Sequence, residues 1–225
     1  MAPYLRYPFN TRSFFIPNKK KDINAGLELW QGYFQSVRPS RDKLFVNVDI
    51  STGVMYKATD LIRLCLEFFR RQSPADLTNI PDRERVRLQR FISNVRVETN
   101  HAGKKRFHVI KKLSRESAST CMFTTREGTS LSVEAYFRSL GIILKYPRLP
   151  CVEVRIFLLI RPQMLIQPQA ARGAMLPMEL CRVVEGQLMR KQFPEDKTSE
   201  MVDFARKKPA ERLAAIREGL QVSRL

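Results

Sequence analysis

The sequence predicts an α+β fold that is mostly β, with a small rolled or closed β-barrel at its centre. Residues 43–51, "KLFVNVDIS", alternate apolar and polar side chains, as a half-buried strand does. Between residues 95 and 147, several strand-like segments of a few residues are separated by turn-forming stretches such as "NHAGKK" and "REGTS". Hydrophobic residues make up 44% of the 225 positions, so the chain can form a packed core.

The first half of the chain predicts one strand and two helices after an irregular start. Residues 1–25 contain prolines and the basic run "NKKK", and we expect them to be irregular. After the strand at 43–51, Thr59 is the expected N-cap of an apolar helix over 60–71. Residues 73–80 read as a loop, and Pro81 is expected to open a second helix over 81–92.

The second half predicts the barrel and a helical tail. The expected strands are "VRVET" at 95–99, "RFHVIKKL" at 106–113, "CMFTT" at 121–125 and "IILKYP" at 142–147. One helix, over 132–140, interrupts them. Residues 176–187 predict a short helix or turn and then an extended piece, and residues 208–220 an amphipathic helix whose Leu213, Ile216 and Leu220 share one face.

Charge is the strongest bulk property of the chain. The 40 Lys and Arg residues exceed the 22 Asp and Glu residues, giving a formal net charge of +18 and a pI near 10.2. Such an excess favours a polyanionic partner, RNA, DNA or an acidic membrane surface, although a basic surface on a soluble protein remains an alternative. No apolar run is long enough to span a bilayer, so we expect no membrane partner.

The sequence does not predict catalysis or a cofactor. The four cysteines are far apart and lack zinc-ligand spacing, so we expect buried, reduced thiols. No nucleophile elbow, H-E-x-x-H motif or Gly-rich phosphate loop is present, and Asp49 has no acidic neighbour for a two-metal site. We expect the chain not to be an enzyme.

The basic segment "HAGKKRFHVIKKLSR" at 101–115 has no acidic residue and carries Phe107 and His108 among its cations. Cations that neutralise phosphates and rings that stack on bases suit a single-stranded nucleic acid. In a strand, Lys105 and Phe107 point to one side and Arg106 and His108 to the other. The alternative is that Phe107 belongs to the core and the lysines form a solvated edge.

Adjacent aromatic residues on the helix over 132–140 cannot fill the same pocket. Tyr136 and Phe137 lie about 100° apart around a helix, so we expect one to face the core and the other to be free to line a groove.

Long stretches of the sequence resemble eukaryotic Argonaute proteins, most closely those of fungi. "GLELWQGYFQSVRPSRDKLFVNVDISTGVMYKATDLIRLCLEFF" resembles the first linker. "VEAYFRSLGIILKYPRLPCVEV" followed by "AMLPMELCRVVEGQ" resembles the second half of the PAZ domain, and "DKTSEMVDFARKKPAERLAAIREGL" the start of the second linker. "YLRYPFNTRSFF" resembles the end of the N domain. The resemblance implies four segments: the N-domain end at 1–25, linker 1 at 26–72, a PAZ domain at 73–190 and linker 2 from 191 to 225.

The resemblance implies an OB-like barrel with an appended hairpin and helix, and a cleft that holds the 3′ end of single-stranded small guide RNA. His101 and Tyr136 match residues that bond the phosphate between the last two nucleotides, and Phe123 matches a base-pocket aromatic. Lys105 and Phe107 match an Arg and a Tyr, so a bidentate fork and a hydroxyl are lost. Arg106 is added as a basic neighbour of Lys105, and Met175 and Leu176 are added as residues of the pocket wall. The expected RNA-binding residues are therefore His101, Lys105, Arg106, Phe107, Phe123, Tyr136, Arg172, Met175 and Leu176.

Other parts of the family pattern differ. No MID or PIWI segment follows in this sequence, so slicing by the family's mechanism is not expected. The expected role is 3′-end binding within RNA silencing, with silencing-complex proteins as further partners. The expected location is the cytoplasm, with the nucleus as an alternative. The alternative is a truncated interaction or decoy fragment without useful RNA affinity.

The segment "RIFLLIRPQMLIQPQAARG" at 155–173 is an insertion relative to the family pattern. We interpret it either as translated intron or as a lineage-specific loop.

Overall fold

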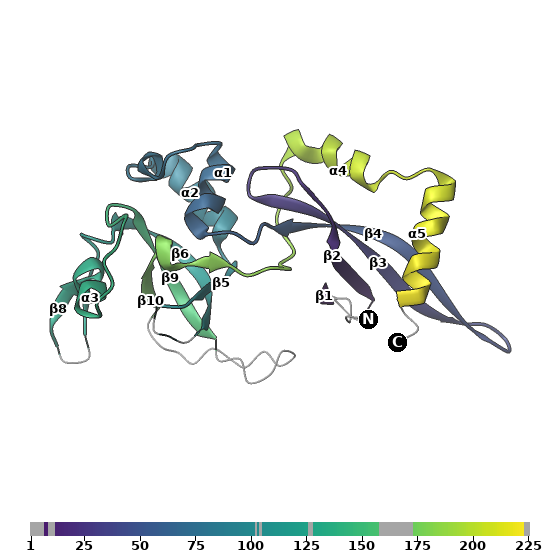
Figure 1. Ribbon diagram of the computed structural model, residues 1–225, viewed down its shortest axis with the longest axis horizontal. Helices are drawn as coiled ribbons and strands as arrows, with labels where there is room; N and C mark the ends of the chain where they lie inside the picture. The colour runs from purple at the N-terminus through teal and green to yellow at the C-terminus, as the bar shows by residue number, and fades with distance from the viewer. Residues whose placement is uncertain are drawn as a thin grey trace. The chain divides into compact units, whose positions relative to one another are not determined.

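The computed structural model describes residues 7–8, 12–101, 103, 105–125, 128–157 and 173–222 (Figure 1). The chain forms two compact units. Unit 1 combines Met1–Tyr56 with Gly186–Leu225, and unit 2 comprises Lys57–Glu185.

Unit 1 is built on an antiparallel sheet with the strand order β1-β2-β3-β4. The strands are β1 (Tyr7–Pro8), β2 (Ser13–Asp22), β3 (Leu27–Pro39) and β4 (Leu44–Tyr56). The expectation that residues 1–25 are irregular is therefore wrong for β2. The register of β2 on β3 shifts between Phe15 and Lys20, and this irregularity accommodates Pro17, which cannot donate to a regular ladder.

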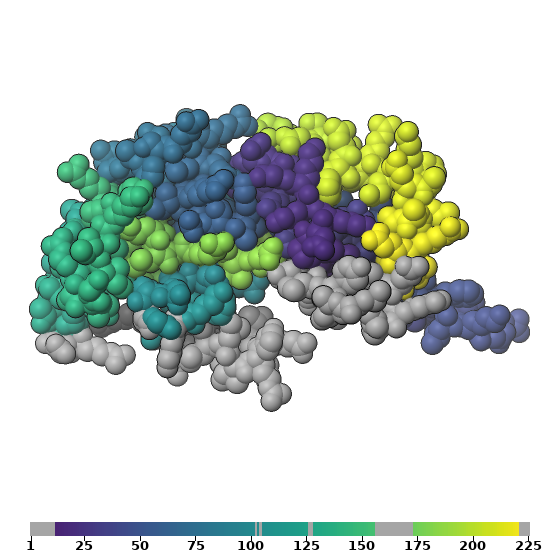
Figure 2. All heavy atoms as spheres, viewed as in Figure 1, coloured from purple at the N-terminus to yellow at the C-terminus, as the bar shows by residue number. Residues whose placement is uncertain are grey.

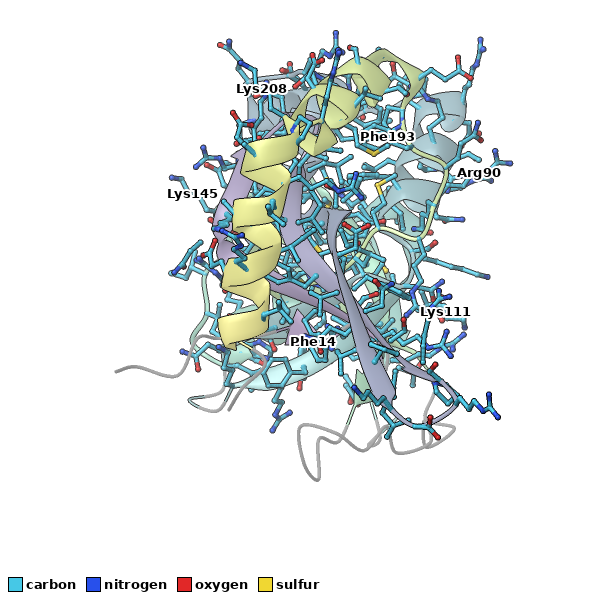
Figure 3. The ribbon with its side chains drawn as sticks, turned by 90° about the vertical axis from the view of Figure 1, so that its right-hand side faces the viewer. Phe14, Arg90, Lys111, Lys145, Phe193 and Lys208 are labelled. Carbon is cyan, nitrogen blue, oxygen red and sulfur yellow. The ribbon has the colours of Figure 1, made fainter. Side chains whose placement is uncertain are left out.

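A C-terminal helical segment covers one part of this sheet. It comprises η3 (Glu195–Lys197), α4 (Thr198–Ala205) and α5 (Pro209–Val222), and Figure 3 shows α5 lying across the strands. Arg212 of α5 pairs with Asp49 of β4 at 2.7 Å, and Ile216 packs against a cluster that includes Tyr33 and Val48.

The tail is a helix, as expected, but of the three residues predicted to share its packed face only Ile216 packs against the sheet. Leu213 and Leu220 are 50% and 41% exposed, whereas Ala215 is 7% exposed. The helix packs through small residues because Gly219 lies directly against the ring of Tyr33, an approach that a leucine would block.

Unit 2 begins with two helices joined by a short turn. They are α1 (Leu61–Phe69) and α2 (Asp82–Ile92), with η1 (Pro74–Leu77) between them, where only a loop was expected. Ser73 and Asp76 form a capping box that explains this extra turn. Pro81 is the residue just before α2, and the rings of Phe68 and Phe91 stack at 4.2 Å between the two helices.

Thr59 does not cap α1, contrary to the prediction. The N-cap is Asp60, and its side chain makes no capping hydrogen bond. The N–H of Leu61 instead donates to the carbonyl of Cys181, while the carbonyl of Thr59 accepts from Val183. A tertiary backbone hydrogen bond therefore satisfies the first N–H group of the helix, which has no partner within the helix.

The main sheet of unit 2 has five antiparallel strands in the order β10-β9-β6-β5-β11. Its strands are β5 (Arg96–Thr99), β6 (Arg106–Ser117), β9 (Pro150–Phe157), β10 (Ala174–Pro177) and β11 (Arg182–Val183), with η2 (Met178–Leu180) before β11. The α+β, mostly β fold class is confirmed. Residues 158–172, most of the expected insertion, lie outside the described residues, between the paired strands β9 and β10.

A hairpin and helix are appended to this sheet between β6 and β9. Strands β7 (Met122–Thr124) and β8 (Ser130–Ser132) form the hairpin, and α3 (Val133–Ser139) follows at once. The strand expected at 142–147 is absent. Gly141, at φ 77°, ends the turn after α3, and the carboxylate of Glu179 accepts the N–H groups of Lys145 and Tyr146 in place of a strand partner.

Within the described residues, no helix is long and apolar enough to cross a membrane, and no group of three or more His, Cys, Asp or Glu side chains could hold a metal ion. All four cysteines are buried free thiols.

Candidate nucleic-acid interface

Four aromatic rings form a continuous chain between the main sheet of unit 2 and its appendage. The rings of His101 and Phe137 lie 5.2 Å apart, those of Phe137 and Tyr136 5.4 Å apart, and those of Tyr136 and Phe123 5.4 Å apart. All three contacts are edge-to-face. We call this set the ring chain. It brings together three of the predicted site residues, His101, Phe123 and Tyr136.

The local hydrogen bonds fix how α3 presents these rings. The side chain of Ser132 caps the helix by accepting from the N–H of Ala135 at 3.1 Å. The N–H of Val133 donates to the carbonyl of Cys121, and that of Glu134 to the carbonyl of Ala118. With the helix fixed in this way, Phe137 is 2% exposed and Tyr136 is 36% exposed. The expectation of one core ring and one free ring is confirmed, and the free ring is that of Tyr136.

The two histidines of the chain are both held in the neutral form. Burial lowers the pKa of His108 to about 4, and His101 and Arg106 add to the effect. Burial, and then Arg106, also lowers the pKa of His101. His108 Nε2 lies 3.1 Å from Thr99 Oγ1, whereas Nδ1 of each histidine is buried without a hydrogen-bond partner among the described residues. His101 is half-buried whereas His108 is 5% exposed, so of the two imidazoles that of His101 is the more accessible to a ligand beside the ring chain.

The basic strand β6 forms a second group next to β5. Lys105 Nζ pairs with Glu98 Oε2 at 2.7 Å and lies 5.8 Å from the ring of Phe107. In the ladder Phe107 is opposite Glu98. Phe107 is half-buried, while His108 and Ile110 are buried, so the alternation predicted for this strand is confirmed and Phe107 is not a core residue. Among the described residues, neither Lys105 nor Phe107 contacts a ring of the ring chain.

Arg106 is exposed and makes no ion pair within the described part of the chain. Its guanidinium is therefore available to an anion, whereas the charge of Lys105 is partly compensated by Glu98.

Strand β10, which carries two of the predicted residues, lies beside α3. Leu176 is 6% exposed and Met175 is half-buried, so Met175 has the more accessible side chain of the two. Arg172, the other predicted residue in this segment, lies outside the described residues.

Two contributors to the site are absent from the predicted set. Glu98 could have been found by counting outward from the turn "NHAGKK", because a hairpin closed there pairs residue 98 with residue 107. Phe137 joins the His101 ring to that of Tyr136, but its inward direction depends on how α3 is anchored, which the sequence does not reveal.

Comparisons with known proteins agree with this architecture. The family model described as Argonaute linker 1 domain matches residues 11–57, and the PAZ domain model matches residues 66–202. The argonaute protein of Schizosaccharomyces pombe is 32% identical over 91% of this chain and 23% of its own length. Protein argonaute 1A of Oryza sativa is 28% identical over 93% of this chain and 18% of its own length.

A solved structure shows the same fold. Kluyveromyces polysporus Argonaute, crystallised with a guide RNA, superposes with a TM-score of 0.61 at 20% identity, covering 97% of this chain and 25% of that one. The chain thus spans about a quarter or less of the length of the relatives it matches. With a PAZ domain that occupies more than half of its residues, preceded by an Argonaute linker 1 domain, the chain belongs to the Argonaute family.

Proposed function

We propose that unit 2 holds the 3′ end of a single-stranded small RNA, as a binding module of an RNA-silencing protein. The observation that carries this proposal is the ring chain: an accessible tyrosine, a phenylalanine and a neutral histidine converge between the appendage and the sheet of a PAZ domain. Base-to-ring stacking needs no base identity, which suits a site that accepts the end of any strand.

Each residue of the ring chain has a separate role in this proposal. The hydroxyl of Tyr136 and a ring N–H of His101 donate to the phosphate between the last two nucleotides. Phe123 supplies a face for the terminal base, and Met175 and Leu176 are apolar residues of the pocket, of which the half-buried Met175 is the more accessible. Phe137 does not touch the RNA but positions the rings on either side of it.

The basic residues of β6 act along the RNA backbone. Arg106, exposed and without an ion pair among the described residues, neutralises a phosphate directly. Lys105 and Phe107 contribute less, because Glu98 shares the lysine and Phe107 has no hydroxyl. By resemblance, Arg172 joins them as a further backbone contact.

At the level of the chain, we propose binding without catalysis and partners among silencing-complex proteins, in the cytoplasm or nucleus. The segment division that we propose is the one implied by the sequence: N-domain end, linker 1, PAZ domain and linker 2. The guide RNA is a property of the Kluyveromyces relative, and its extension to this chain is part of the proposal.

Fluorescence anisotropy tests the function. The chain is titrated into a short single-stranded RNA with a free 3′ end and into the same strand with a bulky 3′ block. We expect tighter binding of the free end, and we expect Tyr136→Ala to abolish the difference between the two strands. Equal binding of both strands by the unaltered chain would contradict the proposal and favour a decoy fragment with only a basic surface.

A further inference from the structure

The sequence contains a single place where a serine or threonine precedes a proline, Ser73-Pro74 in the stretch "FFRRQSPADL". Arg70 and Arg71 lie just before it. The dipeptide joins α1 to η1, and in Figure 2 the spheres of residues 61–92 form part of the outer surface of unit 2. Ser73 is exposed, as is Gln72 before it. This serine is therefore a surface residue with basic side chains on one side in the sequence and a proline on the other.

The backbone around Ser73 is extended. Helix α1 ends at Arg70, whose φ of 56° is left-handed and turns the chain out of the helix. Ser73 has φ −100° and ψ 134°, in the extended region that a following proline favours. An enzyme that modifies a serine holds the segment around it extended in a cleft, and this segment has that form without local unfolding.

The hydroxyl of Ser73 keeps its reactive groups although it caps η1. Its oxygen accepts the N–H of Ala75 at 3.3 Å, and the N–H of Ser73 donates to Asp76 Oδ2 at 3.3 Å. A serine hydroxyl has one proton and two lone pairs, so the cap uses one lone pair only. Among the described residues, no group accepts the O–H proton of Ser73. The oxygen therefore retains a lone pair and a free proton for a group transfer.

We propose that Ser73 is a phosphorylation site for a proline-directed serine/threonine kinase. The γ-phosphorus of ATP forms a bond to Ser73 Oγ as its bond to the β,γ-bridging oxygen breaks, ADP leaves, and the hydroxyl proton passes to a base of the kinase. Pro74 selects this class of kinase, because an apolar subsite accepts a residue without an N–H, whereas the N–H of another residue would lose its hydrogen bond there. The proposal does not depend on RNA binding, since Ser73 lies outside the ring chain and β6.

Asp76 connects the serine to a neighbouring arginine. Arg71 Nη1 donates to the carbonyl of Asp76 at 2.8 Å, and Arg71 Nη2 donates to Glu84 Oε2 at 2.8 Å. A phosphate on Ser73 adds a charge of about −1.5 to −2 and three acceptor oxygens beside the Asp76 carboxylate, which it repels. The N–H of Ser73 then loses its acceptor, and Arg71 exchanges Glu84 for the phosphate. Phosphorylation therefore breaks the link that Arg71 makes between η1 and the first turn of α2.

The test treats the folded full chain with ATP and, in separate reactions, a cyclin-dependent and a mitogen-activated kinase. Mass spectrometry of the peptides locates the phosphate, which we expect on Ser73 with at least one of the two kinases. Ser73→Ala should lose the phosphate and Ser73→Thr should keep it. Pro74→Ala should lose it although the hydroxyl is still present. Circular dichroism verifies that the variants are folded.

Ser40→Ala is the matched control. Ser40 is also exposed and lies between basic residues, in the loop between β3 and β4, but it follows a proline instead of preceding one. Its removal should leave the amount of phosphate unchanged. A folded chain that takes up no phosphate from either kinase would overturn the inference. Phosphate that persists in Pro74→Ala, or that lies mainly on Ser40, would overturn it as well.

Hydrogen exchange of the phosphorylated chain tests the local consequence. Relative to a phosphorylated peptide of the same sequence, the amide of Ser73 should lose protection, while the amides of β5 keep theirs. Unchanged protection at Ser73 would contradict the release of the Asp76 carboxylate. The Ser73→Ala variant should discriminate free from blocked 3′ ends as the unaltered chain does, so that failure of RNA binding and failure of this inference give different results.

Discussion

Tyr136 and Phe137 are neighbours on α3 with opposite surroundings, and the ring chain depends on that difference. The sequence predicted that the two rings would diverge but not which one would be free. That choice is made by the anchoring of α3 at Ser132 and Val133, through contacts to Cys121 and Ala118 that no local pattern reveals. His101 and Phe123 could be predicted as site residues from the resemblance of the sequence, whereas the contacts between the rings could be seen only in the structure.

Replacing these two neighbours separates stability from binding. Phe137→Ala removes a ring that is 2% exposed and should lower the free energy of unfolding by about 3–5 kcal/mol. Tyr136→Ala acts on a ring at the surface and should cost less than about 1 kcal/mol. Urea unfolding of both variants measures the difference, and equal losses would mean that Tyr136 is a structural residue rather than a ligand contact.

His108 makes stability dependent on pH. Its pKa falls from the ordinary 6.5 to about 4 in the folded chain, so that between these values the unfolded state binds a proton that the folded state does not. The contribution of His108 to the free energy of unfolding is therefore fully present above pH 6.5. It decreases by about 3 kcal/mol as the pH falls towards 4. His101, whose pKa is also lowered, contributes with the same sign.

The measurement is urea unfolding at intervals from pH 7 to pH 4, for the unaltered chain and for His108→Gln. The variant cannot take up this proton, so its stability should change less over the interval. Parallel curves for the two proteins would show that the acid dependence comes from other groups.

At the scale of elements, the sequence predicted most helices and barrel strands but missed those whose ends are set by distant parts of the chain. Strand β2 contains Pro17 and a run of lysines, and it forms because β3 pairs with it on either side of a register shift. The apolar run at 142–147 has strand-like composition but forms no strand, because Glu179 accepts its N–H groups.

The close approach of α5 to the sheet predicts an unusual effect of alanine. In a free helix, Gly→Ala stabilises by about 1 kcal/mol. At Gly219 the added Cβ would lie 2.5 Å from the Tyr33 ring, so Gly219→Ala should destabilise unit 1 instead, by about 1–3 kcal/mol. Thermal unfolding checks the sign, with Leu213→Ala at an exposed position of the same helix as a near-neutral control. A stabilised Gly219→Ala variant would show that α5 does not pack there.

Glu179 predicts a local effect on the segment after α3. Glu179→Ala leaves the N–H groups of Lys145 and Tyr146 without their protein acceptor, which should loosen residues 142–149 at a cost of about 1–2 kcal/mol. Hydrogen exchange should become faster at these two amides and stay unchanged in β5. Unchanged exchange at both amides would mean that the carboxylate does not hold the segment.

For the molecule as a whole, the net charge of +18 predicted a polyanionic partner. Unit 1 combines two segments that are far apart in the sequence, Met1–Tyr56 and Gly186–Leu225. The segments predicted from the sequence are consecutive, so this unit was not predicted. Family membership was accessible from long contiguous motifs, and the fold class followed from short strands between turns. Which cations remain unpaired could not be predicted, since it depends on partners such as Glu98 and Asp82.

The central claim, that the ring chain receives the 3′ end of an RNA, is tested most directly by photocrosslinking. A single-stranded RNA carries one 4-thiouridine, either as the 3′-terminal nucleotide or at an internal position, and the crosslinked peptides are identified by mass spectrometry. The account predicts that the terminal probe crosslinks to the peptides containing Phe123 and Tyr136 and that the internal probe does so much less. Crosslinks from the terminal probe that fall mainly on α2 or on unit 1 would contradict it.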